Sequence, residues 1–105
     1  MKLTIPDKIL LHLYQYRSQE GPPSEEQTRM GIAKASQAFD GVALYNLKRA
    51  GFIEQKGTAT HGRTRRRWIA YALTPEGELA AVELICGIEE LHEKVQRLKR
   101  NMEVR

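Results

Sequence analysis

The sequence lacks the features of several large classes of protein. It contains one cysteine, Cys86, among its 105 residues, which excludes an internal disulfide and a cysteine-based zinc site. No apolar run approaches the roughly 20 residues that a membrane-spanning helix needs, and Glu83 interrupts the longest one, at 79–88. The first residues have no small-residue cleavage signal, so they are interpreted as a helix and not as a signal peptide. We therefore expect a cytosolic, reducing compartment and no membrane partner.

The sequence also lacks the residue sets that catalysis and cofactor binding require. It has no Ser/His/Asp arrangement, no paired carboxylates in an apolar setting and no glycine-rich loop of the kind that cradles phosphate. Two of its three histidines, His12 and His92, have no metal-ligand spacing around them, and His61 is interpreted as a phosphate neighbour or a loop residue rather than a ligand. We therefore expect no enzyme activity, no cofactor and no metal site.

Basic residues, in contrast, are concentrated in one part of the chain. There are 17 Lys and Arg against 13 Asp and Glu, which gives a formal net charge of +4. Residues 57–74 contain four arginines and no acidic residue, whereas residues 75–105 contain five basic and seven acidic residues. The net charge of residues 57–74 therefore equals the net charge of the whole chain. Such a basic patch beside a balanced domain is typical of a protein with a polyanionic partner.

The hydrophobic pattern predicts four helices and one β-hairpin. The expected helices are at about 6–17, 25–35, 37–50 and 75–101, and the expected strands are at 52–56 and 65–73. Ser24 and Gln27 fit a capping box before the second helix, and Ser36 is the expected cap of the third. Thr74 followed by Pro75 is a typical start for the last helix.

Several positions have a predicted burial. The third helix gathers its apolar residues on one side, at Ala43, Leu44, Leu47 and Ala50. In the second strand Ile69, Tyr71 and Leu73 share one face, and Arg66, Trp68, Ala70 and Ala72 share the other. Cys86 lies on an apolar face of the last helix and is expected to be buried. The alternative is a redox sensor, which needs an exposed, electropositive site.

This order of elements is that of a winged helix-turn-helix domain, mainly α with a small β-hairpin, followed by a long C-terminal helix. We expect a winged-helix DNA-binding domain at 1–74 and a coiled-coil dimerisation helix at 75–105. The second helix of such a motif enters the major groove and presents side chains to base edges, where Gln pairs well with adenine and Arg with guanine. The predicted reading face consists of Gln37, Gly41, Val42, Tyr45, Lys48 and Arg49.

The hairpin carries the second predicted contact with nucleic acid. Its four arginines, Arg63, Arg65, Arg66 and Arg67, lie within five residues. Such close guanidinium groups repel one another, and bound phosphates offset that repulsion and release counterions. An arginine at the tip also fits a narrow minor groove. The alternative interpretation is a solvated charge run without a partner, and Trp68 serves either hairpin packing or partner contact.

The last helix carries a heptad seam. Apolar residues recur there at steps of three and four, at Ala81, Leu84, Ile88, Leu91, Val95, Leu98 and Met102. At 1.5 Å per residue this helix is about 40 Å long, which is longer than a winged-helix domain can cover. We therefore expect a homodimer through the last six of these residues, with half-sites roughly 34 Å apart or a multiple of that. The alternative is a frayed tail.

Four segments of the sequence resemble winged-helix transcriptional regulators of the MarR-like class, and prokaryotic, especially archaeal, members look most similar. They are 28–35, 44–54 with its Leu-x-x-Leu-x-x-x-Gly-Phe-Ile spacing, 62–67, and 71–77 with its Leu-Thr-Pro-Glu-Gly close. The Leu44-Tyr45 pair also resembles the PadR-like regulators, which dimerise through a C-terminal helix. The resemblance covers about residues 5–80.

The resemblance implies a dimeric DNA-binding regulator, often a repressor. It places reading residues at Gln37, Gly41, Val42 and Tyr45. It also places phosphate-binding arginines, Arg63, Arg65, Arg66 and Arg67, on the wing, which is the hairpin at 52–73. The chain departs from the family at the turn of the motif, because Ile32 and Gly51 are closer together in the sequence than is usual. Either the turn is tightened, or the third helix begins nearer Asp40. In the second case Tyr45 and Arg49 remain base readers and Gln37 does not.

Three functions remain open from the sequence. The first is a homodimeric, sequence-specific DNA-binding regulator. The second is a winged-helix protein-interaction module whose basic hairpin docks an acidic partner, which predicts no preference among DNA sequences. The third is a switch that responds to a small molecule bound between the winged domain and the long helix, although no effector site is visible in the sequence.

Overall fold

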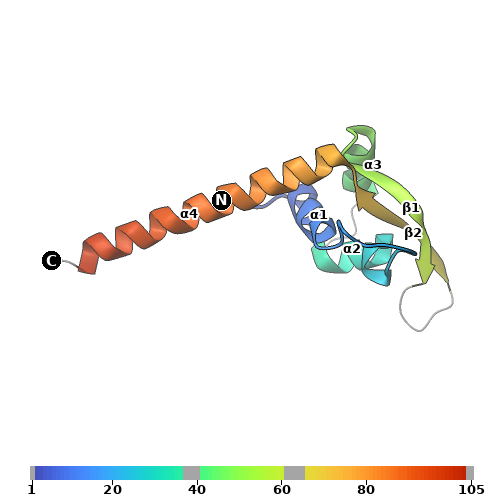
Figure 1. Cartoon of the computed structure of the whole chain (residues 1–105), viewed down its shortest axis with the longest axis horizontal. Helices are drawn as coiled ribbons and strands as arrows, with labels where there is room; N and C mark the ends of the chain where they lie inside the picture. The colour runs from blue at the N-terminus through green and yellow to red at the C-terminus, as the bar shows by residue number, and fades with distance from the viewer. Residues whose placement is uncertain (1, 37–40, 61–65, 104–105) are drawn as a thin grey trace.

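The fold consists of a small body from which one long helix projects (Figure 1). A computed structural model describes residues 2–36, 41–60 and 66–103. Its elements are α1 (Ile5–Tyr14), the 3₁₀ turn η1 (Glu25–Gln27), α2 (Arg29–Ser36), α3 (Gly41–Arg49), β1 (Ile53–Thr60), β2 (Arg67–Leu73) and α4 (Pro75–Glu103). The predicted winged-helix fold is confirmed, and the long helix stretches the molecule to 61 × 29 × 27 Å.

Helix α1 begins one residue before the predicted Pro6 because Thr4 caps it. The backbone N–H of Asp7 donates to the Thr4 hydroxyl at 3.3 Å, and the Asp7 carboxylate accepts from the Thr4 N–H at 3.0 Å. The helix ends at Tyr14, earlier than predicted. Its core side is formed by Ile9, Leu10 and Leu13, which are all buried.

The predicted second helix at 25–35 is wrong at its start. The Ser24 N–H donates to the Gln27 side-chain oxygen at 3.0 Å, as a capping box requires, and the Ser24 hydroxyl donates to the same oxygen at 3.3 Å. The turn that follows is nevertheless a 3₁₀ turn. The chain then becomes extended at Thr28, where it forms a β-bridge with Ala70, and α2 starts only at Arg29. The buried Gln27 amide donates to the Tyr71 carbonyl at 3.4 Å. These contacts fix the helix-turn-helix against the hairpin.

A tight contact within this turn requires glycine at residue 31. A Cβ there would lie 2.6 Å from the carbonyl oxygen of Glu25 and 2.7 Å from the Cα of Glu26.

A hydrogen bond joins α1 to the same turn, because the Nε2 atom of His12 and the Glu26 carbonyl oxygen are 2.7 Å apart. Burial, and then the charge of Glu26, raise the pKa of Tyr16 above its ordinary value.

The first strand of the hairpin is longer than predicted, the second starts later than predicted, at Arg67, and the pairing contains a bulge. Strand β1 continues to Thr60, with an irregularity between Gln55 and Thr58 where Gly57 has φ +94°. The strands are antiparallel, with Ile53 opposite Leu73. A positive φ suits glycine because it has no Cβ, so the bulge can form there without steric cost.

Burial alternates between the two predicted faces of β2 only at the C-terminal end of the strand. Tyr71 and Leu73 are buried, but Ile69 is 42% exposed and Ala70 is fully buried. The two residues differ in burial because they have different neighbours. Thr28 forms its bridge to Ala70 and covers it, whereas Ile69 pairs with Thr58 beyond the bulge.

Helix α4 begins as predicted. The Thr74 hydroxyl accepts from the Gly77 N–H at 3.1 Å and donates to the Gly51 carbonyl. The helix packs against α1 through the buried Ala81 and then leaves the body, and its last helical residue is Glu103. The expected burial of Cys86 is wrong, because its side chain is exposed. Within the described ranges no helix has both the length and the apolar character to cross a membrane.

Candidate nucleic-acid interface

Helix α3 has one side in the core and one side in solvent. Ala43, Leu44 and Leu47 are buried against the other helices and the sheet. On the outer side Val42 is 67% exposed and Tyr45 is 61% exposed. The two exposed side chains lie on the side of α3 that faces away from the core, where an apolar surface is available to a binding partner.

The other predicted reading residues divide into two groups. Lys48 and Arg49 are both exposed in the last turn of α3, and Gly41 is half-buried at its start. Gln37 and Asp40 lie outside the described residues, so the choice between a tightened turn and a later helix start remains a prediction. The described part of α3 therefore carries Tyr45, Lys48 and Arg49 as the candidate polar contacts.

A hollow beside α3 adds a residue that the sequence analysis missed. It has a volume of about 230 Å³ and is lined by Arg29, Gly41, Leu44, Tyr45, Lys48, Gln55 and Tyr71. Gly41 borders the Arg29 guanidinium so closely that a Cβ there would lie 3.0 Å from a guanidinium nitrogen. Arg29 and Lys48 thus bring basic side chains from two different helices to one concave surface.

Arg29 was missed because the predicted helix ran through it without interruption. In a continuous helix at 25–35, Arg29 is only one of several polar residues that are expected to face solvent. The structure makes it the first residue of α2, after the extended Thr28. The signal available in the sequence was Thr28 itself, since a threonine before a helix is a common N-cap.

The described part of the wing holds two of the four predicted arginines. The Arg66 guanidinium lies 4.5 Å from the centre of the Trp68 ring, which is a cation–π distance. Arg67 reaches across the hairpin, where its Nε donates to the Thr58 hydroxyl at 3.0 Å and a terminal N–H donates to the Thr58 carbonyl at 3.4 Å. Arg63 and Arg65 lie outside the described residues. The half-buried Trp68 therefore orients an arginine as well as packing on the hairpin.

The heptad seam of α4 divides at the edge of the body. Ala81 and Leu84 pack against the core formed with α1. Farther along, Ile88, Val95 and Leu98 are exposed, Leu98 most of all at 63%. The side chains of Leu91 and Met102 lie outside the described set. The exposed part of the seam is an apolar stripe on a helix that has left its own body.

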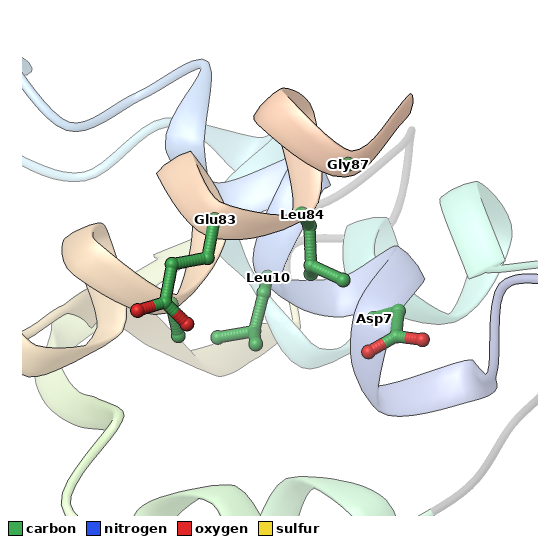
Figure 2. A pocket seen from close by; sticks show the side chains of 6 residues that line it. Asp7, Leu10, Glu83, Leu84 and Gly87 are labelled. Carbon is green, nitrogen blue, oxygen red and sulfur yellow. The ribbon is translucent and has the colours of Figure 1, made fainter. Parts of the chain in front are cut away.

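A cavity of about 290 Å³ lies where the seam meets α1. Leu10, Ala80 and Leu84 line it with apolar groups, and Asp7 and Glu83 add two carboxylates. Figure 2 shows Leu10 and Leu84 lying between these two acidic side chains, with Gly87 on the following turn of α4. The described residues that line this cavity include no lysine, arginine or histidine. Among the residues that the structure describes, no cluster of His, Cys, Asp or Glu is suited to hold a metal ion.

Solved structures of the regulator MepR from S. aureus are similar to this chain. MepR bound to ethidium bromide matches with a TM-score of 0.59 at 26% identity, over 92% of this chain and 64% of that one. The S. aureus MepR–DNA complex matches with a TM-score of 0.58 at 27% identity, over 95% and 74% respectively. The chain thus spans about two thirds of the MepR length in the ethidium complex.

MepR is a winged-helix regulator of the MarR family, so the resemblance to the MarR-like class is confirmed by structure. No family model matches the sequence, and no curated protein matches it.

Proposed function

We propose that this chain is a homodimeric, sequence-specific DNA-binding transcription regulator that acts as a repressor. The observation that carries the proposal is the outer face of α3, which holds Tyr45, Lys48 and Arg49 in water within a fold similar to the MepR–DNA complex. In this role α3 enters the major groove. Lys48 and Arg49 supply donors for guanine or phosphate, and Val42 contacts a thymine methyl.

The wing supports the same role from a second element. The Arg66 guanidinium lies over the Trp68 ring and Arg67 donates to Thr58, so contacts within the hairpin position both guanidinium groups. Ordering the donors in advance reduces the entropic cost of binding. We place the wing on the DNA backbone or in the minor groove, and the hollow between Arg29 and Lys48 on a backbone phosphate.

The decisive experiment is selection of binding sites from random duplex DNA, followed by binding isotherms at several salt concentrations. A regulator gives an enriched sequence and an affinity that falls steeply with salt. The competing function, a protein-interaction module whose basic hairpin docks an acidic partner, gives no preference among sequences. A reporter gene behind the selected site then tests repression, and a rise in expression when the protein is present contradicts it.

Base reading by α3 is tested at Tyr45. We expect Tyr45→Ala to reduce the ratio of specific to non-specific affinity by about tenfold, because one good base contact contributes roughly 1–3 kcal/mol of discrimination. Competition between the selected duplex and a scrambled one measures this ratio.

The matched control for Tyr45 is Tyr14→Ala, which removes the same side chain from α1 on the body. It should leave the ratio unchanged, and its melting temperature reports any loss of fold. An unchanged ratio in Tyr45→Ala would remove Tyr45 from the reading face.

Dimerisation is tested at Val95, on the exposed part of the seam. We expect Val95→Asp to weaken self-association by at least about 100-fold, because an unpaired carboxylate would be buried against the partner. Sedimentation equilibrium at micromolar concentration measures the mass.

The control for Val95 is Gln96→Asp, which adds the same charge on the next residue, off the seam. It should leave the mass of a dimer unchanged. Equal masses for the wild type and Val95→Asp would contradict the seam as the interface.

A further inference from the structure

The charges of α4 are separated along its length. Residues 75–93 contain six glutamates and no lysine or arginine, whereas residues 94–105 contain five basic residues and one glutamate. Two such helices side by side in the same direction would place glutamates near glutamates and basic residues near basic residues. In opposite directions each basic end meets an acidic segment. Charge complementarity therefore favours the antiparallel pairing.

The body end of the seam has the shape and charge to receive such a basic end. The cavity between α1 and α4 has an apolar lining at Leu10 and Leu84 and two carboxylates, Asp7 and Glu83. The far end of α4 offers the opposite combination. Leu98 is the most exposed of the seam residues whose side chains are described, and Lys99 and Arg100 follow it in the sequence. Both halves of a self-complementary contact are thus present in one chain.

We propose that α4 pairs antiparallel with α4 of a second copy, and that Leu98 of the partner subunit enters the cavity between α1 and α4. This inference rests on the proposed homodimer and specifies its geometry. In the register that it requires, Leu84 lies opposite Leu98 of the partner subunit and Ile88 lies opposite Val95 of the partner subunit. Two-fold symmetry repeats both contacts at the other end, so four layers of the seam are filled.

The geometry has a consequence for DNA binding. The two bodies lie at opposite ends of the paired helices, and Ala81 of one copy lies near residue 102 of the other. The two Ala81 residues are then separated by about 21 helical residues, or roughly 32 Å along the axis. One turn of B-DNA is about 34 Å. Antiparallel pairing therefore sets the bodies at a separation that matches adjacent half-sites.

The direction of pairing is tested by a spin–spin distance on DNA-free protein. In a Cys86→Ser background, Leu79→Cys provides an exposed labelling position. Antiparallel pairing in this register places the two labels about 35 Å apart, whereas parallel pairing keeps them within about 20 Å because packed helix axes are only 8–10 Å apart. A distance near 35 Å supports the proposal, and a distance below 20 Å overturns it while leaving the dimer intact. A monomer at all concentrations would instead refute the proposed dimer.

The use of the cavity is tested by exchanging charges within one chain. We expect Glu83→Lys and Lys99→Glu each to weaken self-association by about threefold to fivefold at low salt, as exposed pairs typically do. The double variant Glu83→Lys/Lys99→Glu should recover the wild-type dissociation constant to within about twofold, since each copy then restores both ends. Additive losses in the double variant overturn the pairing of these ends.

The cavity has one other plausible class of occupant, an apolar organic cation, and tetraphenylphosphonium is a suitable probe. If the partner's helix fills the cavity, the probe should bind the Val95→Asp monomer and not the wild-type dimer, and it should compete with dimer formation. Binding of the probe to the intact dimer with equal affinity, abolished by Glu83→Gln, would overturn the assignment of the cavity to the partner.

Discussion

Replacing Gly77 with alanine is expected to lower the free energy of unfolding by about 3 kcal/mol or more, which is a large effect for a single methyl group. A Cβ at residue 77 would lie 1.9 Å from the carbonyl oxygen of Phe52 and 2.9 Å from its carbonyl carbon. Both are backbone atoms, so no side-chain rotation relieves the overlap. The measurement is urea or thermal unfolding, and the melting temperature should fall by at least about 12 °C.

Two opposing effects decide the sign of this change. Alanine stabilises a helix interior by about 1 kcal/mol relative to glycine. Against this, the Phe52 carbonyl cannot move away without loss, because it accepts a hydrogen bond from the Thr74 N–H at 3.1 Å. The Gly77 N–H is likewise held by the Thr74 hydroxyl. The overlap therefore outweighs the gain in helix propensity.

The control for Gly77 is Glu76→Ala in the same helical turn. It removes an exposed acidic side chain near a helix N-terminus and should cost less than about 1 kcal/mol. Equal or greater stability in Gly77→Ala would mean that the start of α4 can move away from Phe52. The helix would then not be rigidly joined to the hairpin.

Gly77 also illustrates what the sequence can and cannot predict. The Leu-Thr-Pro-Glu-Gly close is recognisable, and Thr74 with Pro75 predicts the start of α4 correctly. The reason for the glycine is not visible, because Phe52 is 25 residues earlier in the sequence. A close approach between backbones depends on tertiary packing, which local sequence patterns do not encode.

The errors in the helix-turn-helix have the same origin. A capping box predicts a helix start at Ser24, and the cap is present. The chain nevertheless becomes extended at Thr28 because Ala70 offers a β-bridge and Tyr71 offers an acceptor to the buried Gln27. A local preference is thus overridden by partners more than 40 residues away.

Helix α4 shows where hydrophobic periodicity is ambiguous. The sequence places apolar residues on two of its faces, and the structure buries only the first turns of the seam. Leu79, Val82 and Cys86 are exposed, because α1 covers one side of α4 and the body ends soon after Ala81. An apolar stripe predicts burial but not the element that provides it, and here a second copy of the chain is the proposed cover.

Removing the wing arginines is expected to have the largest effect on DNA binding. The fourfold change of Arg63, Arg65, Arg66 and Arg67 to alanine should lower affinity for the selected duplex by at least about 100-fold near physiological salt, because each neutralised phosphate releases counterions. The slope of log affinity against log salt should become shallower by about 3 to 4, or roughly 0.9 for each phosphate that the variant no longer neutralises. Fluorescence anisotropy over a salt series measures both quantities.

A second comparison separates the effect of net charge on DNA binding from the effect of where the arginines lie. The pair Arg66→Ala/Arg67→Ala and the pair Lys2→Ala/Lys8→Ala remove equal charge, and Lys2 and Lys8 are exposed on or beside α1. If the wing contacts phosphate, the first pair reduces the salt slope by about 2 and the second leaves it nearly unchanged. Equal effects of the two pairs would reduce the wing to a source of general attraction. Unchanged binding in the fourfold variant would exclude the wing from the DNA interface and leave α3 and the cations beside it as the whole contact.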